Sequence, residues 1–290
     1  MGFTVVGIGE LLWDLFPEGK RLGGAPANFA YHCKAFGLES FPVSCVGNDD
    51  PGRQILPVLE SHNVDVSFIA TDPEHPTGTV SVQVDKNGKP EYIIHEDVAW
   101  DHIRLTEEMV TLAKETDAVC FGSLAQRSKT SRATIRKFLL GTRSDCIKIY
   151  DINLRQHYYS QELIEDMLEL STALKLNDEE LTVVAELMGI SGREKALIEQ
   201  IASRYSLDIV ALTKGSAGSC LYQGGRYSEH KGYDAKVVDT VGAGDSFTAV
   251  LVAGLLLNYE LDKINDLANK TAAYVCSQPG AMPKMSIAIE

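Results

Sequence analysis

The stretch AKVVDTVGAGDSFTAVLVAGLLL, residues 235–257, runs from a strand-like segment through a cluster of small residues into an apolar segment. The composition predicts a β-strand over 235–240 and a helix over 245–257. The glycines then lie where a helix begins, and the free N–H groups of a helix start attract an anion such as phosphate. Asp245 is an isolated carboxylate at this place, either as a helix cap or beside a phosphate site.

The order of short strand and longer helix recurs along the chain. Strands are expected at 4–9, 118–122, 146–152, 173–176 and 208–213. Helices are expected at 26–36, 51–62, 106–115, 129–140, 160–171, 178–188, 192–204, 245–257 and 263–277. This alternation predicts an α/β fold with a mostly parallel sheet covered by helices. In such sheets ligands bind beyond the carboxyl ends of the strands.

Residues 77–100 break this order, because they alternate with period two around Asn87-Gly88. The pattern predicts an antiparallel hairpin, which cannot lie inside a parallel core. It is either a plain edge hairpin or a lid, with 11–22 as further strand. No repeat or linker divides the chain elsewhere, so 1–290 is expected to be one α/β domain with this small β lid.

The composition excludes several classes of protein. The chain has 290 residues, of which 44% are hydrophobic, and a formal net charge of −13, so nucleic acid is not an expected partner. Its most apolar run, 249–257, is too short to cross a membrane, and no basic leader is recognisable. The six cysteines are dispersed without a CxxC pair, which favours buried thiols in the reducing cytoplasm. The signature around Asp245 is neither a Walker A loop nor a GxGxxG fingerprint.

A second glycine cluster lies in LGGAPANFA, residues 22–30. Gly23 and Gly24 allow close approach of a ligand to the backbone, and Asn28 together with Asp14 can bond vicinal hydroxyls. Taken alone, the stretch favours a tight turn with a satisfied Asn.

Polar residues also end a strand in YDINLR, residues 150–155. Asp151, Asn153 and Arg155 occupy alternate positions, so period two predicts that they share one side of the strand. This side can face the ligand crevice, although an Asp/Arg pair can also be structural.

Two further stretches allow a structural and a functional interpretation. In KLNDEEL, residues 175–181, Asn177 and Glu180 have the spacing of a capping box, and they can also orient water on Mg²⁺. In ALTKGSAGS, residues 211–219, a strand leads into a glycine turn that can follow a phosphate tail or form a plain hairpin.

Taken together and in order, these stretches resemble the ribokinase, or pfkB, family of ATP-dependent carbohydrate kinases. The most specific part is DTVGAGDSF, residues 239–247, which matches the family signature DTxGAGDxF. GGAPAN, DINLR, NDEE and TKGSAG fall at the family's order and spacing, over nearly the whole chain. The resemblance implies a ribokinase-like sheet flanked by helices with a small β lid, and ATP and Mg²⁺ as its cofactors.

The resemblance also implies roles for individual residues. Asp245 matches the general base, and the amides of Gly242, Ala243 and Gly244 match the anion hole. The implied sugar-binding residues are Asp14, Gly23, Gly24, Asn28, Asn153 and Arg155. The implied nucleotide-binding residues are Asn177, Thr213, Gly215, Gly218 and Asn269. Asn177 and Glu180 match the motif that organises Mg²⁺, and Asp239, Val241 and Gly280 match a monovalent cation site for K⁺.

Within the family, GELLWDLFP and GGAPANFA look most like the fructokinases, which implies phosphorylation of D-fructose at a primary hydroxyl, giving fructose 6-phosphate. Arg155 keeps a 2-keto-3-deoxygluconate kinase open, and ribokinases and nucleoside kinases share the signature. A non-catalytic sugar- or nucleotide-binding regulator on the same fold is the alternative from another class. A homodimer formed through the lid also stays open.

Overall fold

The computed structural model describes residues 2–17, 19–84 and 90–285, and the statements below concern these ranges. A nine-stranded sheet has the order β13-β12-β11-β10-β9-β8-β1-β4-β5. Its strands are β1 (Thr4–Ile8), β4 (Glu39–Gly47), β5 (Ile69–Asp72), β8 (Ala118–Phe121), β9 (Ile147–Asp151), β10 (Ala173–Asn177), β11 (Ile209–Thr213), β12 (Ser219–Gln223) and β13 (Arg226–His230). The pairs from β5 to β11 are parallel, and β12 and β13 add an antiparallel edge. The predicted mostly parallel sheet is confirmed.

The helices agree with the predicted ranges to within two residues at each end. They are α1 (Ala25–Ala35), α2 (Asp50–Ser61), α3 (Glu107–Glu115), α4 (Lys129–Gly141), α5 (Gln161–Glu169), α6 (Asp178–Met188), α7 (Glu194–Tyr205), α8 (Ala243–Leu256) and α9 (Leu261–Cys276). Side chains that cap the first backbone N–H groups determine where several of these helices begin. Thr106 and Ser160 each accept a hydrogen bond from the backbone N–H three residues later, which caps α3 and α5. No described helix is long and apolar enough to cross a membrane.

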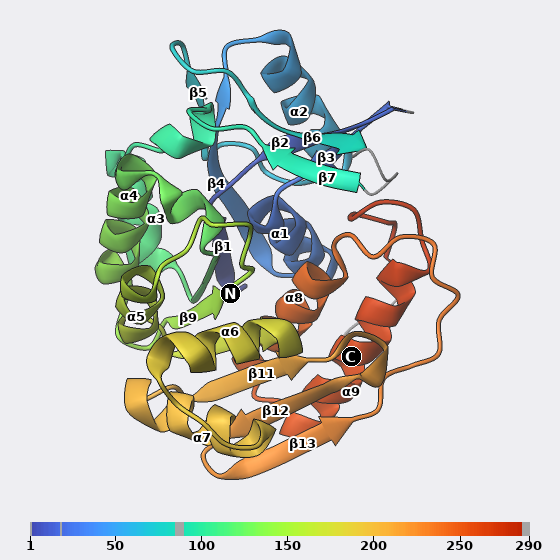
Figure 1. Ribbon diagram of the computed structural model, residues 1–290. Helices are drawn as coiled ribbons and strands as arrows, with labels where there is room; N and C mark the ends of the chain where they lie inside the picture. The colour runs from blue at the N-terminus through green and yellow to red at the C-terminus, as the bar shows by residue number, and fades with distance from the viewer. Residues whose placement is uncertain (1, 18, 85–89, 286–290) are drawn as a thin grey trace.

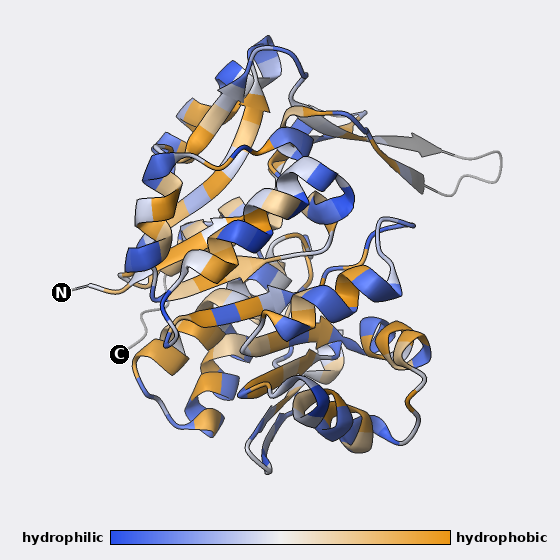
Figure 2. Ribbon diagram, turned by 90° about the vertical axis from the view of Figure 1, so that its left-hand side faces the viewer, coloured by the Kyte–Doolittle hydropathy of each residue, from blue (hydrophilic) through white to orange (hydrophobic). Residues whose placement is uncertain are grey.

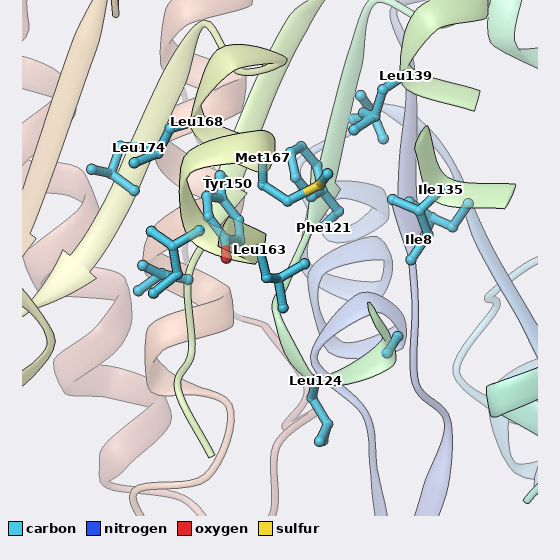
Figure 3. Close-up of a cluster of buried hydrophobic side chains, with 14 of the residues drawn as sticks. Ile8, Phe121, Leu124, Ile135, Leu139, Tyr150, Leu163, Met167, Leu168 and Leu174 are labelled. Atoms are coloured by element: carbon cyan, nitrogen blue, oxygen red, sulfur yellow. The ribbon is translucent and has the colours of Figure 1, made fainter. Parts of the chain in front are cut away.

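The helices cover both faces of the large sheet (Figure 1). Side chains alternate along each strand, so neighbouring residues such as Ile149 and Tyr150 enter opposite cores. One core lies against α3 to α7, where Phe121 and Tyr150 of the sheet pack with Met167 of α5 (Figure 3). The other core lies against α1, α8 and α9. Figure 2 shows the hydrophobic strands enclosed between helices whose outer sides are hydrophilic.

A small separate sheet lies beside α1 at one end of the molecule (Figure 1). Its order is β3-β2-β6-β7, with β2 (Leu12–Phe16), β3 (Gly19–Gly23), β6 (Gly78–Val84) and β7 (Pro90–Ile94). The predicted small sheet from 11–22 and 77–100 is therefore present, with two strands in the first segment. Its second segment ends as strand at Ile94, and Ala99–His102 forms a 3₁₀ turn instead. The predicted turn at Asn87-Gly88 lies outside the described residues.

The predicted strand over 235–240 is wrong. Residues 231–240 have no helix or strand, and Val237 and Val238 are 63% and 57% exposed. The N–H groups of Val238 and Asp239 both bond the Cys276 carbonyl at the end of α9, at 2.8 and 3.2 Å. The segment is held by a helix end rather than by a neighbouring strand, so its two valines find no core to enter.

Candidate active site

Two cavities meet at the N-terminus of α8, where Thr240 and Gly244 line both of them. The carboxylate cavity, of about 590 Å³, is named for its four acidic side chains. Its polar and glycine lining includes Glu10, Asp14, Gly23, Gly24, Asn28, Asp151, Asn153, Arg155, Lys175, Gly242, Gly244 and Asp245. The glycine cavity, of about 400 Å³, is lined by Thr213, Gly215, Gly218, Ala243, Phe247, Asn269 and Ala272, among others. Most residues that the sequence singled out therefore gather around one junction.

Asp245 lies in the first turn of α8 and lines the carboxylate cavity. The side-chain amide of Asn28 in α1 donates a hydrogen bond to its Oδ2 at 2.7 Å. Burial, reinforced by the nearby Asp151 carboxylate, raises the pKa of Asp245 to about 7. A carboxylate with such a pKa is suited to accept a proton near neutral pH.

Lys175, in the middle of β10, was not among the predicted site residues. Its Nζ lies 3.0 Å from Asp151 Oδ1, and the hydroxyl of Thr248 in α8 donates to Asp151 Oδ2 at 2.8 Å. The Asp151, Glu180 and Asp245 carboxylates around the buried ammonium group raise the pKa of Lys175. Burial alone would lower the pKa of Lys175, but these carboxylates outweigh it and favour the charged ammonium group in the cavity that Asp245 also lines. A single charge inside the apolar run ALKL was the sequence signal for it.

Glu10, which follows β1, was also missed as a site residue. Its side chain is buried and lines the carboxylate cavity, and its Oε2 has no hydrogen-bond partner among the described residues. Burial raises the pKa of the Glu10 carboxyl above its usual range. The signal was again one charge at the end of an apolar strand.

The turn before α8 brings backbone to the junction of the cavities. Gly242 begins the helix with φ of 79°, in the left-handed region. A Cβ on Gly242 would lie 2.6 Å from the Ala281 carbonyl oxygen, so glycine is required there for space as well as conformation. Of the first residues of α8, Gly244 lines both cavities and Ala243 lines the glycine cavity. The N–H of Ala243 bonds the Thr240 carbonyl at 3.4 Å, while the first N–H groups of a helix have no carbonyl partner inside the helix itself. The helix start therefore lies where the two cavities meet, and its role as an anion hole stays a prediction.

The end of β9 supplies one wall of the carboxylate cavity. Asp151, Asn153 and Arg155 all line it. The prediction that the three residues share one side of a strand is wrong, because the strand ends at Asp151 and Asn153 has φ of 43°. The ion-pair partner of Asp151 is Lys175, and the Arg155 guanidinium bonds the carbonyl of its neighbour Leu154 at 3.0 Å.

The glycine cavity lies along the turn between β11 and β12. Thr213, Gly215 and Gly218 line it, and the two strands pair antiparallel, so the turn also forms a hairpin. A Cβ on Gly218 would lie 2.0 Å from the His230 carbonyl oxygen, which requires glycine at this close backbone crossing. Asn269 of α9 lines the same cavity, while its amide group donates to Ser219 Oγ at 2.7 Å.

Asn177 and Glu180 form the capping box of α6. Asn177 Oδ1 accepts from the Glu180 N–H, and Glu180 Oε2 accepts from the Asn177 N–H, each at 2.8 Å. The Leu154 N–H also bonds Glu180 Oε1 at 3.0 Å. Neither residue lines either cavity, so the described contacts support the structural interpretation, and a role with Mg²⁺ stays a prediction.

Backbone hydrogen bonds hold Asp239, Val241 and Gly280 together, and their role as a K⁺ site stays a prediction. Asp239 Oδ1 accepts from the Val241 N–H at 3.1 Å, and Oδ2 from the Gly280 N–H at 3.2 Å. Arg21 of β3 also reaches Asp239 Oδ2, at 2.8 Å. The Asp239 carboxylate thus joins the loop before α8 to the small sheet.

Comparison with known proteins agrees with this arrangement. Residues 17–288 match the pfkB family carbohydrate kinase model. A protein of Pyrococcus horikoshii described as a sugar kinase is 30% identical over 296 residues, covering 96% of this chain and 91% of that protein. A Salmonella typhimurium fructokinase is 29% identical over 294 residues, covering 95% and 94%.

A solved structure of the Pyrococcus horikoshii sugar kinase matches this fold with a TM-score of 0.81 at 28% identity, over 96% of this chain and 93% of that one. A structure of a Xylella fastidiosa fructokinase has a TM-score of 0.83 at 18% identity, over 97% and 94%, and shows a likeness of fold. The match of the family model to most of the sequence, together with these relatives, means that this chain belongs to the pfkB family of carbohydrate kinases.

Proposed function

We propose that this protein transfers the γ-phosphate of MgATP to a primary hydroxyl of a sugar, most simply D-fructose, giving fructose 6-phosphate. One observation carries the proposal: a carboxylate-lined cavity and a glycine-lined cavity meet at Gly244, one residue before Asp245. Sugar in the first cavity and nucleotide in the second would bring their reacting groups together at the helix start.

The polar lining of the carboxylate cavity suits a neutral polyhydroxyl ligand. Glu10 Oε2 and Asn28 Oδ1 are buried without a hydrogen-bond partner among the described residues, which costs free energy until a donor arrives. Sugar hydroxyls are such donors, and Asp14 offers another acceptor at the same wall. The Salmonella typhimurium and Klebsiella pneumoniae relatives named fructokinase, 29% and 30% identical, support fructose among neutral sugars.

The glycine cavity supports ATP as the phosphate donor. Its lining combines apolar side chains, including Phe247 and Ala272, with the turn at Gly215 and Gly218, which suits an adenine and a phosphate tail. The Pyrococcus horikoshii sugar kinase has also been solved in complex with ATP, at 28% identity and a TM-score of 0.78.

Mg²⁺ would neutralise charge on the phosphate oxygens when bound. Both oxygens of Glu180 already accept backbone hydrogen bonds, so Glu180 and Asn177 would act on the ion through water rather than as direct ligands. Asp239, Val241 and Gly280 remain our candidates for a K⁺ site, with the Val241 carbonyl as an oxygen ligand.

In the proposed reaction, Asp245 accepts the proton of the primary hydroxyl as that oxygen attacks phosphorus. The amides at the start of α8 and the Lys175 ammonium stabilise the charge that develops on the transferred group. Asn28 holds the carboxylate of Asp245 in place through its 2.7 Å hydrogen bond. Closure of the small sheet would keep water from competing with the sugar.

Arg155 favours a second candidate, 2-keto-3-deoxygluconate. Its side chain lies at the cavity wall, and its guanidinium can bind a sugar carboxylate in a bidentate manner. The four carboxylates of the cavity weigh against an acidic substrate, whereas two cations, Arg155 and Lys175, offset part of that charge.

The deciding measurement is kcat/KM with MgATP for fructose, ribose, 2-keto-3-deoxygluconate and adenosine, with ADP release as the readout. Fructose should give the highest value, and Arg155→Ala should lower it less than it lowers the value for 2-keto-3-deoxygluconate. A preference for 2-keto-3-deoxygluconate that Arg155→Ala abolishes would establish the second candidate instead. No sugar-dependent ADP release with any of the four would favour a non-catalytic binding protein.

A further inference from the structure

Two histidines and an aspartate gather at the base of the small sheet, away from the carboxylate and glycine cavities. They are His75, Asp97 and His102, and one ligand atom from each lies within 4.8 Å of the others. His75 precedes β6 by three residues, Asp97 follows β7 by three residues, and His102 ends the 3₁₀ turn Ala99–His102. The cluster therefore ties together the two chain segments through which the β6–β7 hairpin joins the body.

When the His75 ring is neutral, its Nε2 and the Asp97 carboxylate oxygen that it faces are both hydrogen-bond acceptors. Its Nδ1 lies 2.9 Å from Asp72 Oδ2, so the neutral ring keeps its proton on Nδ1 and a lone pair on Nε2. That Nε2 faces Asp97 Oδ1 at 3.6 Å, too far for a hydrogen bond. A lone pair and a carboxylate oxygen in this arrangement repel each other unless a second proton on the ring or a metal cation lies between them.

We propose that this place binds one divalent transition-metal ion of the Zn²⁺ class, with His75 Nε2, His102 Nε2 and Asp97 Oδ1 as ligands. Imidazole nitrogen and carboxylate oxygen are the donors that Zn²⁺ takes in proteins, whereas Mg²⁺ prefers oxygen alone. Two ligands of one tetrahedral zinc ion lie about 3.3 to 3.5 Å apart, as follows from bonds of about 2.0 to 2.2 Å. The observed 3.6 Å from His75 to Asp97 is close to that separation.

The surroundings of the cluster support an ion. Asp72 bonds Nδ1 of His75, the ring nitrogen that would not bind the metal. A carboxylate in this place is common at metal sites, because it fixes the orientation of the histidine ring that binds the ion. The histidine side chains are mostly buried, 19% and 22% exposed, while Asp97 is 79% exposed and offers a path for entry.

Binding requires a local rearrangement of the two rings. They are stacked with centroids 3.5 Å apart and planes 11° from parallel, and His102 Nε2 bonds Asp97 Oδ1 at 2.9 Å. Each metal bond lies in the plane of its ring, so the rings must turn apart and the 2.9 Å contact must lengthen by about half an ångström to reach zinc spacing. Rotation of an imidazole about its terminal torsion has broad minima, so a change of side-chain torsions can contribute to this movement at little cost.

The consequence concerns the hairpin. Val80 of β6 and Ile94 of β7 line the carboxylate cavity, so an ion at the base of the hairpin would restrain part of the cavity wall. An ion bound at the proposed site would thus restrict movement of the small sheet, and its removal would release that restriction.

Chelator-treated, full-length protein should be titrated with Zn²⁺ by calorimetry in buffer that contains excess Mg²⁺. We expect about one equivalent to bind and Co²⁺ to give the visible absorption of a four-coordinate site. His75→Ala and His102→Ala should lose this binding, and His62→Ala, at the end of α2, should bind as the unmodified protein does. Asp72→Asn keeps an oxygen for the backbone N–H groups of Glu74 and His75 but changes the His75 partner, so it should weaken binding by about 10- to 100-fold.

Thermal unfolding of each metal-free variant, together with His102→Asn as a milder change, shows whether a loss of binding comes from a loss of folding. Absence of stoichiometric Zn²⁺ binding to the folded unmodified protein would overturn the proposal. Undiminished binding to a folded His75→Ala, His102→Ala double variant would overturn it as well.

Discussion

The pKa of Asp245 depends on its burial, on a neighbouring carboxylate and on one hydrogen bond, and these influences do not all act in the same direction. Burial and then Asp151 raise its pKa to about 7, while the hydrogen bond from Asn28 lowers it. The folded protein therefore holds a carboxyl group whose ionisation is costly at the pH where the proposed reaction needs it ionised. Function and stability make opposite demands on this residue.

The variant Asp245→Asn separates these demands. It keeps an oxygen that accepts from Asn28 but cannot take a proton, so we expect kcat to fall about 10²- to 10⁴-fold while nucleotide affinity persists. The raised folded pKa means that the buried carboxylate lowers stability increasingly from about pH 4 up to about 7. Asp245→Asn should therefore raise the melting temperature, more at pH 8 than at pH 5. Turnover near that of the unmodified enzyme would rule out the assignment as general base.

The pH profile gives a second test at the same residue. If Asp245 is the base, kcat/KM for the sugar should rise about tenfold per pH unit below its pKa and level off above about pH 7. Asn28→Ala removes a hydrogen bond to the ionised form, so its inflection should move to higher pH. Asn153→Ala, in the same cavity, is the matched control and should leave the inflection in place. An inflection that Asn28→Ala does not move would argue that another group titrates.

At the level of elements, variants at the start of α6 can distinguish a structural role of Asn177 and Glu180 from a catalytic one. Asn177→Ala removes the side-chain cap and should lower the free energy of unfolding by about 1 kcal/mol. Glu180→Gln should raise the Mg²⁺ concentration needed for half-maximal activity if Glu180 orients water on the ion. Glu179→Gln, one residue earlier and exposed, is the control for charge at the helix start. Equal Mg²⁺ dependence in Glu180→Gln and the control would leave α6 with a capping role alone.

The helices could be predicted well because their signals are local, such as Thr106 and Ser160 at helix starts. The run at 235–240 could not, because valines indicate a strand only where a neighbouring strand is available, and here the partner is the end of α9. Lys175 was missed for a similar reason. Its partner Asp151 lies on β9, which pairs with β10, so the ion pair follows from the strand order rather than from either stretch.

At the scale of the molecule, the small sheet and the large α/β body meet at the proposed site of reaction. Asp14 of β2, Val80 of β6 and Ile94 of β7 line the cavity that Asp245 lines from α8. The position of the small sheet should therefore decide whether the cavity is open to water. The ion pair of Arg21 with Asp239 joins the two parts at the loop before α8.

That ion pair is a weak contributor to folding, because the Arg21 side chain is 48% exposed and exposed pairs contribute about 0 to 1 kcal/mol. Loss of the ion pair should instead affect how completely the small sheet closes over the carboxylate cavity. We expect Arg21→Ala to keep the melting temperature nearly unchanged, to raise KM for the sugar, and to increase ATP hydrolysed per sugar phosphorylated, because water enters an incompletely closed cavity. Arg53→Ala, which breaks an exposed pair within α2, is the matched control. A sugar KM and a coupling ratio equal to those of the control would show that the small sheet closes without this bridge, or that it does not act as a lid.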